Sequence, residues 1–340
     1  MKKLLIIIFV SFISLFGFIS LFNKEEISIY ERRKLKKFPS LNNNNFFDDL
    51  DKYLSDHFIF RQDFREVKGF VNYNLFNISI NNKVTIKDDY LFELAETNYR
   101  SLDNVVAKVN DIIRRFDIND YEFIAIPLKN HYVGLDNVSE EINEYLGVRI
   151  DNYYSLIDLL SLSDYYRTDI HLKQDRLGSV VSKILELCDV EEKDIEYSFN
   201  TYNKFYGSLY AKMAIGMKPD TITYLTNDSL NGVKVESVED KDLLDVYNVS
   251  ELESFDPYSV YLNGPKAYLK IINENVADRK LIIFRDSYTS SIAPLLIPYF
   301  SEIELIDLRY YSSDLLNIDG DSKVLFIFGS EVLNNSFSIK

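Results

Sequence analysis

Cysteine, histidine and tryptophan are scarce in this chain of 340 residues, which has one cysteine, three histidines and no tryptophan. The single cysteine, Cys188, excludes an intrachain disulfide framework and a cysteine-rich metal site. Apolar residues around Cys188 recur at helical spacing, so we expect its side chain to lie in the core. The histidines His57, His131 and His171 are too scattered to predict a metal site, and no residue pattern indicates a cofactor.

Basic residues are also fewer than acidic residues. The 38 lysines and arginines oppose 53 aspartates and glutamates, which gives a net charge of −15. A chain of this charge repels the phosphates of duplex nucleic acid, so we expect no nucleic-acid partner. The sequence also lacks a glycine-rich phosphate loop and a repeat of fixed period.

One long apolar run is present, from Leu4 to Phe22. These 19 residues would rise about 28 Å as a helix, close to the hydrocarbon thickness of a bilayer. The run is longer than the apolar region of a signal peptide, so we expect residues 1–23 to be an uncleaved single-pass anchor in the cell membrane. Lys2 and Lys3 precede the run, so we expect the N-terminus to be cytoplasmic and the C-terminal domain extracytoplasmic. A cleaved signal peptide is the alternative, against which the lack of an Ala-x-Ala-like site argues.

Residues 24–80 are predicted to be a membrane-proximal segment. The charged stretch from Ile27 to Leu41 ends at an asparagine run and is typical of a tether. Two apolar stripes at helical spacing follow, one from Phe46 to Leu54 and one from Phe64 to Leu75. They predict two short amphipathic helices.

Residues 81–340 are predicted to form one α/β domain. A hairpin over Val84 to Leu94 leads into it, and the apolar face of Leu102 to Phe116 predicts its clearest helix, with Ser101 as the N-cap. Strand-like runs rich in β-branched and aromatic residues follow at Tyr121–Ile126, Lys280–Phe284, Glu302–Leu308 and Lys323–Phe328. Helices that alternate with such strands point to a layered α/β architecture.

A serine stands where one of these strands ends. The run Lys280–Phe284 leads into Arg285-Asp286-Ser287-Tyr288, and a segment with helical character follows as far as Phe300. A hydroxyl at such a junction lies at the sheet edge beside the unpaired N–H groups of a helix N-terminus, where hydrolases and acyltransferases place a nucleophile. Asp286 or Ser287 is equally suited to be the N-cap of that helix, and the two roles are compatible.

A base for that serine is offered by Thr168-Asp169-Ile170-His171. In an extended segment the side chains of Asp169 and His171 share a face, so the carboxylate can orient the imidazole. The acid of a serine triad has this role, while the histidine takes the serine proton. The alternative is that Asp169 caps the following helix and His171 is a partly buried surface residue.

An ordered set of short motifs, from about residue 30 to the C-terminus, resembles the DHHW family. The segments that carry the resemblance are Glu31-Arg32-Arg33, Pro39, Phe47, Tyr53, Asp56-His57-Phe58, Arg61, Asp89-Tyr90-Leu91-Phe92, Pro127-Leu128-Lys129, Thr168-Asp169-Ile170-His171, Arg285-Asp286-Ser287-Tyr288 and Ile306-Asp307-Leu308-Arg309-Tyr310-Tyr311. That family is similar to the AlgX/AlgJ-type proteins of alginate O-acetylation, which have an SGNH-hydrolase-like domain.

The resemblance implies an SGNH-hydrolase-like (flavodoxin-like) three-layer α/β/α domain, with a triad in the chain order Asp, His, Ser, reversed from ordinary SGNH hydrolases. It makes Asp169 the orienting acid, His171 the base and Ser287 the nucleophile. Where the family motif reads Asp-His-His-Trp, this chain has Ile170 and Leu172 at the second and fourth positions. The outer pair is kept, and the loss of the tryptophan removes a large aromatic wall from the expected substrate contacts.

The resemblance also implies a glycine-rich turn with an asparagine that contributes to the oxyanion hole. Asn263 and Gly264 are the candidates, although the asparagine is shifted relative to the glycine and Pro265 has no N–H to donate. Tyr288 and Arg309 are further candidates to contact the substrate or the oxyanion. For Arg309, pairing with one of the many acids is the alternative.

The other two histidines are interpreted differently. His57 lies with Arg61 in a family-like segment near the anchor, and we expect both to be structural. His131 follows a strand end, where sites occur in α/β sheets, but has no acid next to it in the sequence.

Together these features predict a membrane-anchored, extracytoplasmic O-acetyltransferase that acts on an exported polysaccharide through an acyl-serine intermediate. By resemblance, a multi-spanning membrane-bound O-acyltransferase is the expected partner that supplies acetyl groups. A carbohydrate acetylesterase with the same triad is one alternative, since water can replace the sugar hydroxyl. A non-catalytic polysaccharide-binding or scaffolding module is the other, because 25 tyrosines and 24 phenylalanines supply rings that can stack on sugars.

Overall fold

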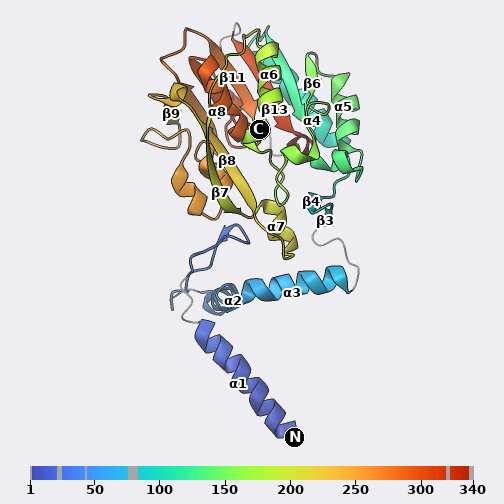
Figure 1. The fold of residues 1–340 in the computed structure, drawn as a ribbon, viewed down its shortest axis with the longest axis vertical. Coiled ribbons are helices and arrows are strands. Elements are labelled where there is room, and N and C mark those ends of the chain that lie inside the picture. Colours follow the sequence, from blue (N-terminus) through green and yellow to red (C-terminus); the bar gives the residue numbers. More distant parts are fainter. Residues whose placement is uncertain (1, 21–24, 43, 76–82, 319–321, 337–340) are drawn as a thin grey trace.

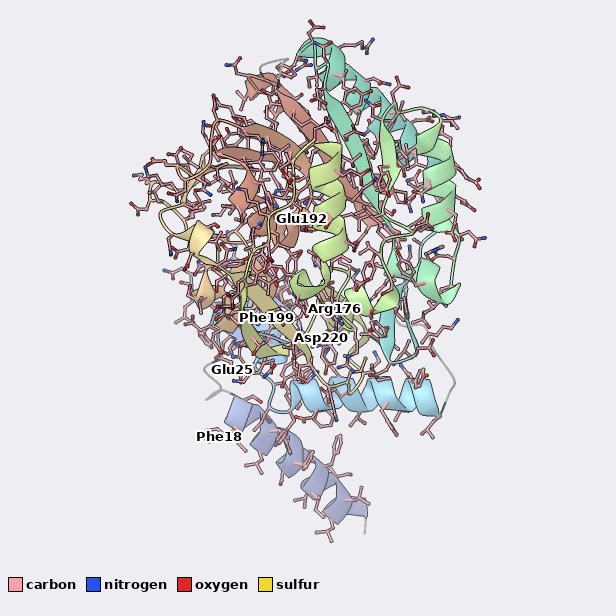
Figure 2. The ribbon with its side chains drawn as sticks, turned by 45° about the horizontal axis from the view of Figure 1, so that its top comes forward. Phe18, Glu25, Arg176, Glu192, Phe199 and Asp220 are labelled. Carbon is pink, nitrogen blue, oxygen red and sulfur yellow. The ribbon has the colours of Figure 1, made fainter. Side chains whose placement is uncertain are left out.

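The computed structural model describes residues 2–20, 25–42, 44–75, 83–318 and 322–336. Its first helix, α1 (Lys2–Ser20), is long and apolar enough to cross a membrane by length and composition. Figure 2 shows most of α1 projecting away from the rest of the molecule, and the helix contacts the following segment near its C-terminal end. The predicted end of the anchor at residue 23 and the predicted domain boundary at residue 80 lie outside the described residues.

The membrane-proximal segment is a hairpin followed by two helices. Strands β1 (Ile27–Ser28) and β2 (Arg33–Lys34) pair antiparallel, and helices α2 (Phe46–Asp56) and α3 (Arg61–Asn74) follow. Both predicted helices are present, and residues 27–34 of the predicted tether form a hairpin. Figure 1 shows α2 and α3 between α1 and the α/β domain.

A seven-stranded sheet forms the centre of the α/β domain. Five neighbouring strands are parallel, and two further strands extend one edge, each paired antiparallel with its neighbour. In spatial order the strands are β6 (Tyr153–Ser155), β5 (Tyr121–Ile126), β13 (Lys323–Gly329), β11 (Lys280–Arg285), β12 (Glu302–Ile306), β10 (Tyr268–Ile272) and β9 (Lys234–Ser237). The four strands predicted from the sequence are therefore confirmed, and the structure shows that they are neighbours in one mostly parallel sheet.

The strand order explains why the expected triad is reversed along the chain. When the parallel strands are counted from β11 through β12 and β13 and then from β5 to β6, their spatial order is 2-1-3-4-5. That is the strand order of flavodoxin, but here the chain enters the sheet at a different strand, β5. The first and third strands of this count, β11 and β13, flank the place where the order reverses, and ligands bind at such a switch point in open α/β sheets.

Two layers of helices cover the sheet because side chains of the central strands alternate between its faces. In β11, Leu281 and Ile283 belong to one buried core, whereas Ile282 and Phe284 belong to the other. Helices α6 (Gly178–Leu187) and α8 (Thr289–Leu296) cover the first face, and α4 (Tyr99–Arg115), α5 (Val138–Gly147) and α9 (Ser330–Leu333) cover the second. Burial of each large aliphatic side chain contributes about 1.5–3 kcal/mol.

The predicted cap of the first domain helix is wrong by three residues. Asn98, not Ser101, caps α4, and its side-chain oxygen accepts a hydrogen bond from the Ser101 N–H at 3.2 Å. Ser101 lies inside the helix, where its buried hydroxyl donates to the carbonyl oxygen of Leu333 at 2.8 Å. Cys188, next to α6, is partly buried against the first core.

Two smaller hairpins complete the domain. The predicted hairpin is confirmed as β3 (Val84–Lys87) and β4 (Tyr90–Glu93). A second hairpin, β7 (Ser198–Phe205) and β8 (Asp220–Thr226), carries the short helix α7 (Ser208–Met213) between its strands. Figure 1 shows both hairpins and α7 at the end of the domain nearest to α3.

Candidate functional site

Three side chains that are far apart in the sequence meet at the end of β11. The imidazole Nδ1 of His171 lies 2.5 Å from Asp169 Oδ1, and its Nε2 lies 2.8 Å from Ser287 Oγ. A carboxylate only accepts hydrogen bonds, so Nδ1 carries the proton and Nε2 is left to accept from the serine hydroxyl. Asp169 is fully buried, His171 is nearly so, and Ser287 is partly exposed.

The turn that presents Ser287 is held by the residue before it. One carboxylate oxygen of Asp286 accepts the N–H of Tyr288 at 2.9 Å, and the other accepts the N–H of Gly329 at 2.7 Å. These bonds tie the end of β11 to the end of β13, the two strands on either side of the switch point. Ser287 therefore stands on a rigid corner of the sheet.

Asp169 is surrounded by donors. Its Oδ1 accepts the backbone N–H of His171 at 3.0 Å, and its Oδ2 accepts the N–H of Ser208 at 2.6 Å and a guanidinium N–H of Arg32 at 2.8 Å. Burial by itself would raise the pKa of Asp169, but His171, Arg32 and the Ser208 N–H hold that pKa well below its usual value. The carboxylate is therefore kept ionised and fixed in place.

Arg32 comes from the turn of the membrane-proximal hairpin, 137 residues before Asp169. Its guanidinium also pairs with Asp256, and its side chain is 12% exposed. Nothing in the sequence indicated this contact, because Arg32 was recognised only within a family-like motif. The predicted tether thus supplies a direct partner of the carboxylate.

A second network holds the loop that carries Asp169. The ammonium group of Lys129 donates to the carbonyl oxygens of Tyr166, Arg167 and Asp169 at 2.9, 3.3 and 2.7 Å. Burial lowers the pKa of Lys129 to about 7, although three carbonyl acceptors match its three donors. Asp220, the first residue of β8, holds the same loop through a different contact (Figure 2). Its carboxylate oxygen accepts the Thr168 N–H at 2.8 Å.

Close packing beneath Asp169 requires a glycine at position 207. A Cβ atom there would overlap the Cβ of Asp169 and the carbonyl oxygen of Thr168, neither of which is the end of a flexible side chain. We expect Gly207→Ala to lower the free energy of unfolding by roughly 2–4 kcal/mol, because the loop must shift.

Gly178, at the start of α6, gives a matched control for this prediction. A Cβ at Gly178 would meet nothing within 4 Å, so we expect Gly178→Ala to leave stability unchanged or raise it by about 0.4–1 kcal/mol. Denaturant unfolding of both variants tests the prediction, and equal stabilities would contradict the close packing at Gly207.

Tyr258 is a site residue that the sequence did not reveal. Its ring stacks on the imidazole of His171, with ring centroids 4.0 Å apart and planes 13° from parallel. Its hydroxyl lies 3.2 Å from the carbonyl oxygen of Ser287 and 3.1 Å from the hydroxyl of Ser291. Tyr258 thereby places an aromatic ring beside the histidine in a chain that contains no tryptophan.

A small cavity opens beside the Ser287 hydroxyl. The predicted candidates Tyr288 and Arg309 line it together with Glu331. Arg309 is held by Asp307 through two hydrogen bonds of 2.9 and 2.7 Å, so it both pairs with an acid and faces the cavity. Burial, with a contribution from the charge of Glu93, raises the pKa of Glu331 to about 7.

The predicted asparagine of the oxyanion hole is engaged elsewhere. The amide nitrogen of Asn263 donates to the carbonyl oxygen of Asp245 at 2.7 Å, and its oxygen accepts from Asn248 at 2.9 Å. Neither Asn263 nor Gly264 is among the residues that line the cavity at Ser287. The residue types of this turn fit the motif, but the structure joins its asparagine to the neighbouring loop instead of the cavity at Ser287.

The two remaining histidines lie in other surroundings. His57 is buried, with Nε2 2.9 Å from the carbonyl oxygen of Lys36. His131 has an acid after all, since its Nδ1 lies 2.5 Å from Glu140 Oε1 of α5, nine residues on. Within the described ranges, no three histidine, cysteine, aspartate or glutamate side chains gather as metal ligands.

The serine, histidine and carboxylate are linked by hydrogen bonds at the switch point of a three-layer α/β fold. Serine hydrolases and acyltransferases use this arrangement. Similar solved structures agree with this fold. A DHHW family protein from Eubacterium siraeum has a TM-score of 0.61 at 20% identity, over 76% of this chain and 95% of that chain. PatB1 from Bacillus cereus, also solved with a sulfonyl adduct, has a TM-score of 0.59 at 18% identity, over 74% of this chain and 96% of its own.

The chain therefore shares the fold of a DHHW family protein, which confirms the predicted resemblance at the level of the fold. The O-acetyltransferase domain of Pseudomonas putida AlgJ is a more distant match, at 10% identity over 74% of this chain and 92% of that chain. Its TM-score of 0.41 is too low to establish a common fold. No family model and no curated protein matches the sequence.

Proposed function

We propose that this protein is a membrane-anchored, extracytoplasmic O-acetyltransferase that transfers an acetyl group to an exported polysaccharide through Ser287. One observation carries the proposal. The His171 ring bridges Asp169 and Ser287 with hydrogen bonds of 2.5 and 2.8 Å, in the orientation that general-base catalysis needs.

In the first half of the proposed reaction, Ser287 Oγ attacks the carbonyl carbon of an acetyl ester and its proton passes to His171 Nε2. The Asp169 carboxylate stabilises the imidazolium that forms. The tetrahedral intermediate then expels the donor oxygen, which takes the proton from His171, and the acetyl group remains as an ester on Ser287.

In the second half, a sugar hydroxyl gives its proton to His171 and attacks the acetyl-serine. Collapse of this intermediate breaks the bond to Ser287 Oγ, which takes the proton back, and leaves the sugar acetylated. The Arg309 side chain, which lines the same cavity, is the candidate to stabilise the negative oxygen in both steps.

The sugar acceptor and the membrane-bound O-acyltransferase donor partner come from the sequence resemblance. If water instead of a sugar hydroxyl accepted the acetyl group, the same residues would catalyse ester hydrolysis and the protein would be an acetylesterase. Transfer is favoured by the membrane-proximal hairpin, because Arg32 ties the site to the segment that follows α1. That link supports a site near the bilayer, where a membrane-bound donor would deliver acetyl groups.

Covalent trapping tests the nucleophile directly. The full chain in detergent is mixed with an aryl acetate, quenched in acid and analysed by intact-mass and peptide mass spectrometry. We expect one added acetyl group, located on Ser287, and competition for that position by an aryl sulfonyl fluoride. An acetyl group on another residue would contradict the assignment, and the absence of both acetylation and ester turnover would leave the binding-module alternative.

Addition of acetylated or free oligosaccharides to the trapped enzyme then separates the two enzymatic outcomes. Loss of the acetyl group from Ser287 with its appearance on the sugar supports transfer. Loss at the same rate with and without the sugar identifies an esterase.

A further inference from the structure

Helix α3 is placed with its polar face inward. The Arg65 guanidinium donates to the carbonyl oxygen of Ala211 at 2.7 Å, and the hydroxyl of Tyr210 in α7 donates to Glu66 at 2.7 Å. Gly69 lies so close to the residues after α7 that an added Cβ would sit 2.5 Å from the carbonyl oxygen of Ala214. The α/β domain is therefore bound through polar groups and a close backbone approach.

The apolar stripe of α3 faces outward instead. Phe64 is 54% exposed and Val67 59%, and the residues that flank the helix are also exposed, Phe60 at 54% and Leu75 at 71%. An amphipathic helix of a soluble domain normally buries this stripe. A contiguous apolar surface that is left exposed marks a site of protein or membrane contact.

The apolar surface of α3 continues into the predicted anchor. Phe16 of α1 has its ring centroid 6.3 Å from that of Phe58 and 6.1 Å from that of Phe60. Between α2 and α3, Leu54, Phe58 and Phe64 line a shallow groove. Its other lining residues are Ser55, Arg61, Arg65 and Lys68, so a basic edge accompanies the apolar floor.

Charge distribution distinguishes the same segment from the rest of the chain. Residues 25–75 contain nine basic and nine acidic residues, whereas the whole chain carries −15. The acidic domain beyond residue 75 is repelled by anionic lipid headgroups, but the neutral membrane-proximal segment is not.

We propose that α3 lies flat on the bilayer surface, with Phe64, Val67 and Leu75 inserted among the lipid acyl chains and Lys68 near the headgroups. Interfacial helices bind in this way, with the apolar face buried and basic side chains beside it. Because α3 packs on α7, and the Ser208 N–H of α7 donates to Asp169, this contact sets the distance of the site from the bilayer. The inference does not depend on the reaction that the site performs.

The lack of tryptophan makes this contact measurable. Single tryptophans are introduced by F64W and V67W into the full chain, which is reconstituted into phosphatidylcholine–phosphatidylglycerol vesicles, with or without bromine on the acyl chains. V148W is the matched control, because Val148 is 78% exposed and follows α5, which Figure 1 places away from α1 and α3. F9W reports on α1, where Phe9 is 61% exposed.

Brominated lipid should quench the fluorescence of F64W and V67W, and leave that of V148W unchanged, in chains that float with the vesicles. Quenching of F9W alone would overturn the proposal, since α3 would then stand clear of the bilayer. A blue-shifted but unquenched F64W would also overturn it, because another copy of the chain would cover the stripe. Failure of the chain to float with vesicles would do the same.

Discussion

Ser287→Ala is expected to lower ester turnover by at least about 10³-fold, because no other hydroxyl is hydrogen-bonded to His171 Nε2 among the described residues. His171→Ala should have an effect of similar size, since the serine loses its base. The double variant should be no slower than either single variant, because the two residues act as one unit. Initial rates with an aryl acetate, measured on the full chain, give all three values.

Two controls in the chain match these variants closely. Ser330 also follows a parallel strand at the same edge of the sheet, is buried, and has no hydrogen-bond partner for its hydroxyl among the described residues. His131 forms its own pair with Glu140. Ser330→Ala and His131→Ala should therefore keep most of the activity. Rates for Ser287→Ala and His171→Ala that equal those of these controls would contradict the triad.

Arg32→Gln is expected to lower the free energy of unfolding by about 3 kcal/mol, because it leaves the buried Asp169 carboxylate without its guanidinium partner. Activity should fall as well, since Asp169 is held in place partly by this bond. Arg33→Gln is the matched control. Arg33 pairs with Glu31 and Asp56, and its side chain is 38% exposed, so its loss should cost only about 1 kcal/mol or less.

The same variant should change the stability at low pH. The pKa of Asp169 is held below its unfolded value of 3.8, so its stabilising contribution is present above that pH and is lost as the pH falls through the folded value. Without Arg32 the folded pKa lies higher and the contribution is smaller. Acid unfolding, followed by circular dichroism, should therefore begin at a higher pH in Arg32→Gln than in the parent chain.

A double-mutant cycle keeps this prediction testable if Arg32→Gln folds poorly. Asp169→Asn removes the charge that Arg32 compensates, so Arg32→Gln should cost less in the Asp169→Asn background than alone. Additive costs would mean that the two side chains do not interact, and the hairpin would then have no electrostatic link to the site.

The predictions that held were those based on local patterns. Strand β5 begins and ends where the predicted run does, and β11 and β13 each extend one residue beyond the predicted runs. A strand buried on both faces of a parallel sheet is recognisable in the sequence as a continuous run of apolar residues. The Ser287 junction and the Asp169–His171 spacing are local in the same sense, and the fold brings them together.

The structure differed from the predictions where a local motif was compatible with more than one structure. Ser101 and Asn98 are both good N-caps, and the domain helix begins at the earlier one. Asn263 stands in a turn of the right composition, but its amide hydrogen-bonds to Asp245 and Asn248. Tyr258 left no signal among 25 tyrosines.

The sequence by itself determined the apolar helix at the N-terminus, the strands of the sheet and the chemical groups that Asp169, His171 and Ser287 can offer, because each depends on residues close together in the chain. Only the tertiary structure decided that β13 lies between β5 and β11, that His171 reaches a serine 116 residues away, and that Arg32 of the hairpin contacts the buried carboxylate. Contacts between distant segments depend on how complete surfaces pack, and a local residue pattern does not record that packing.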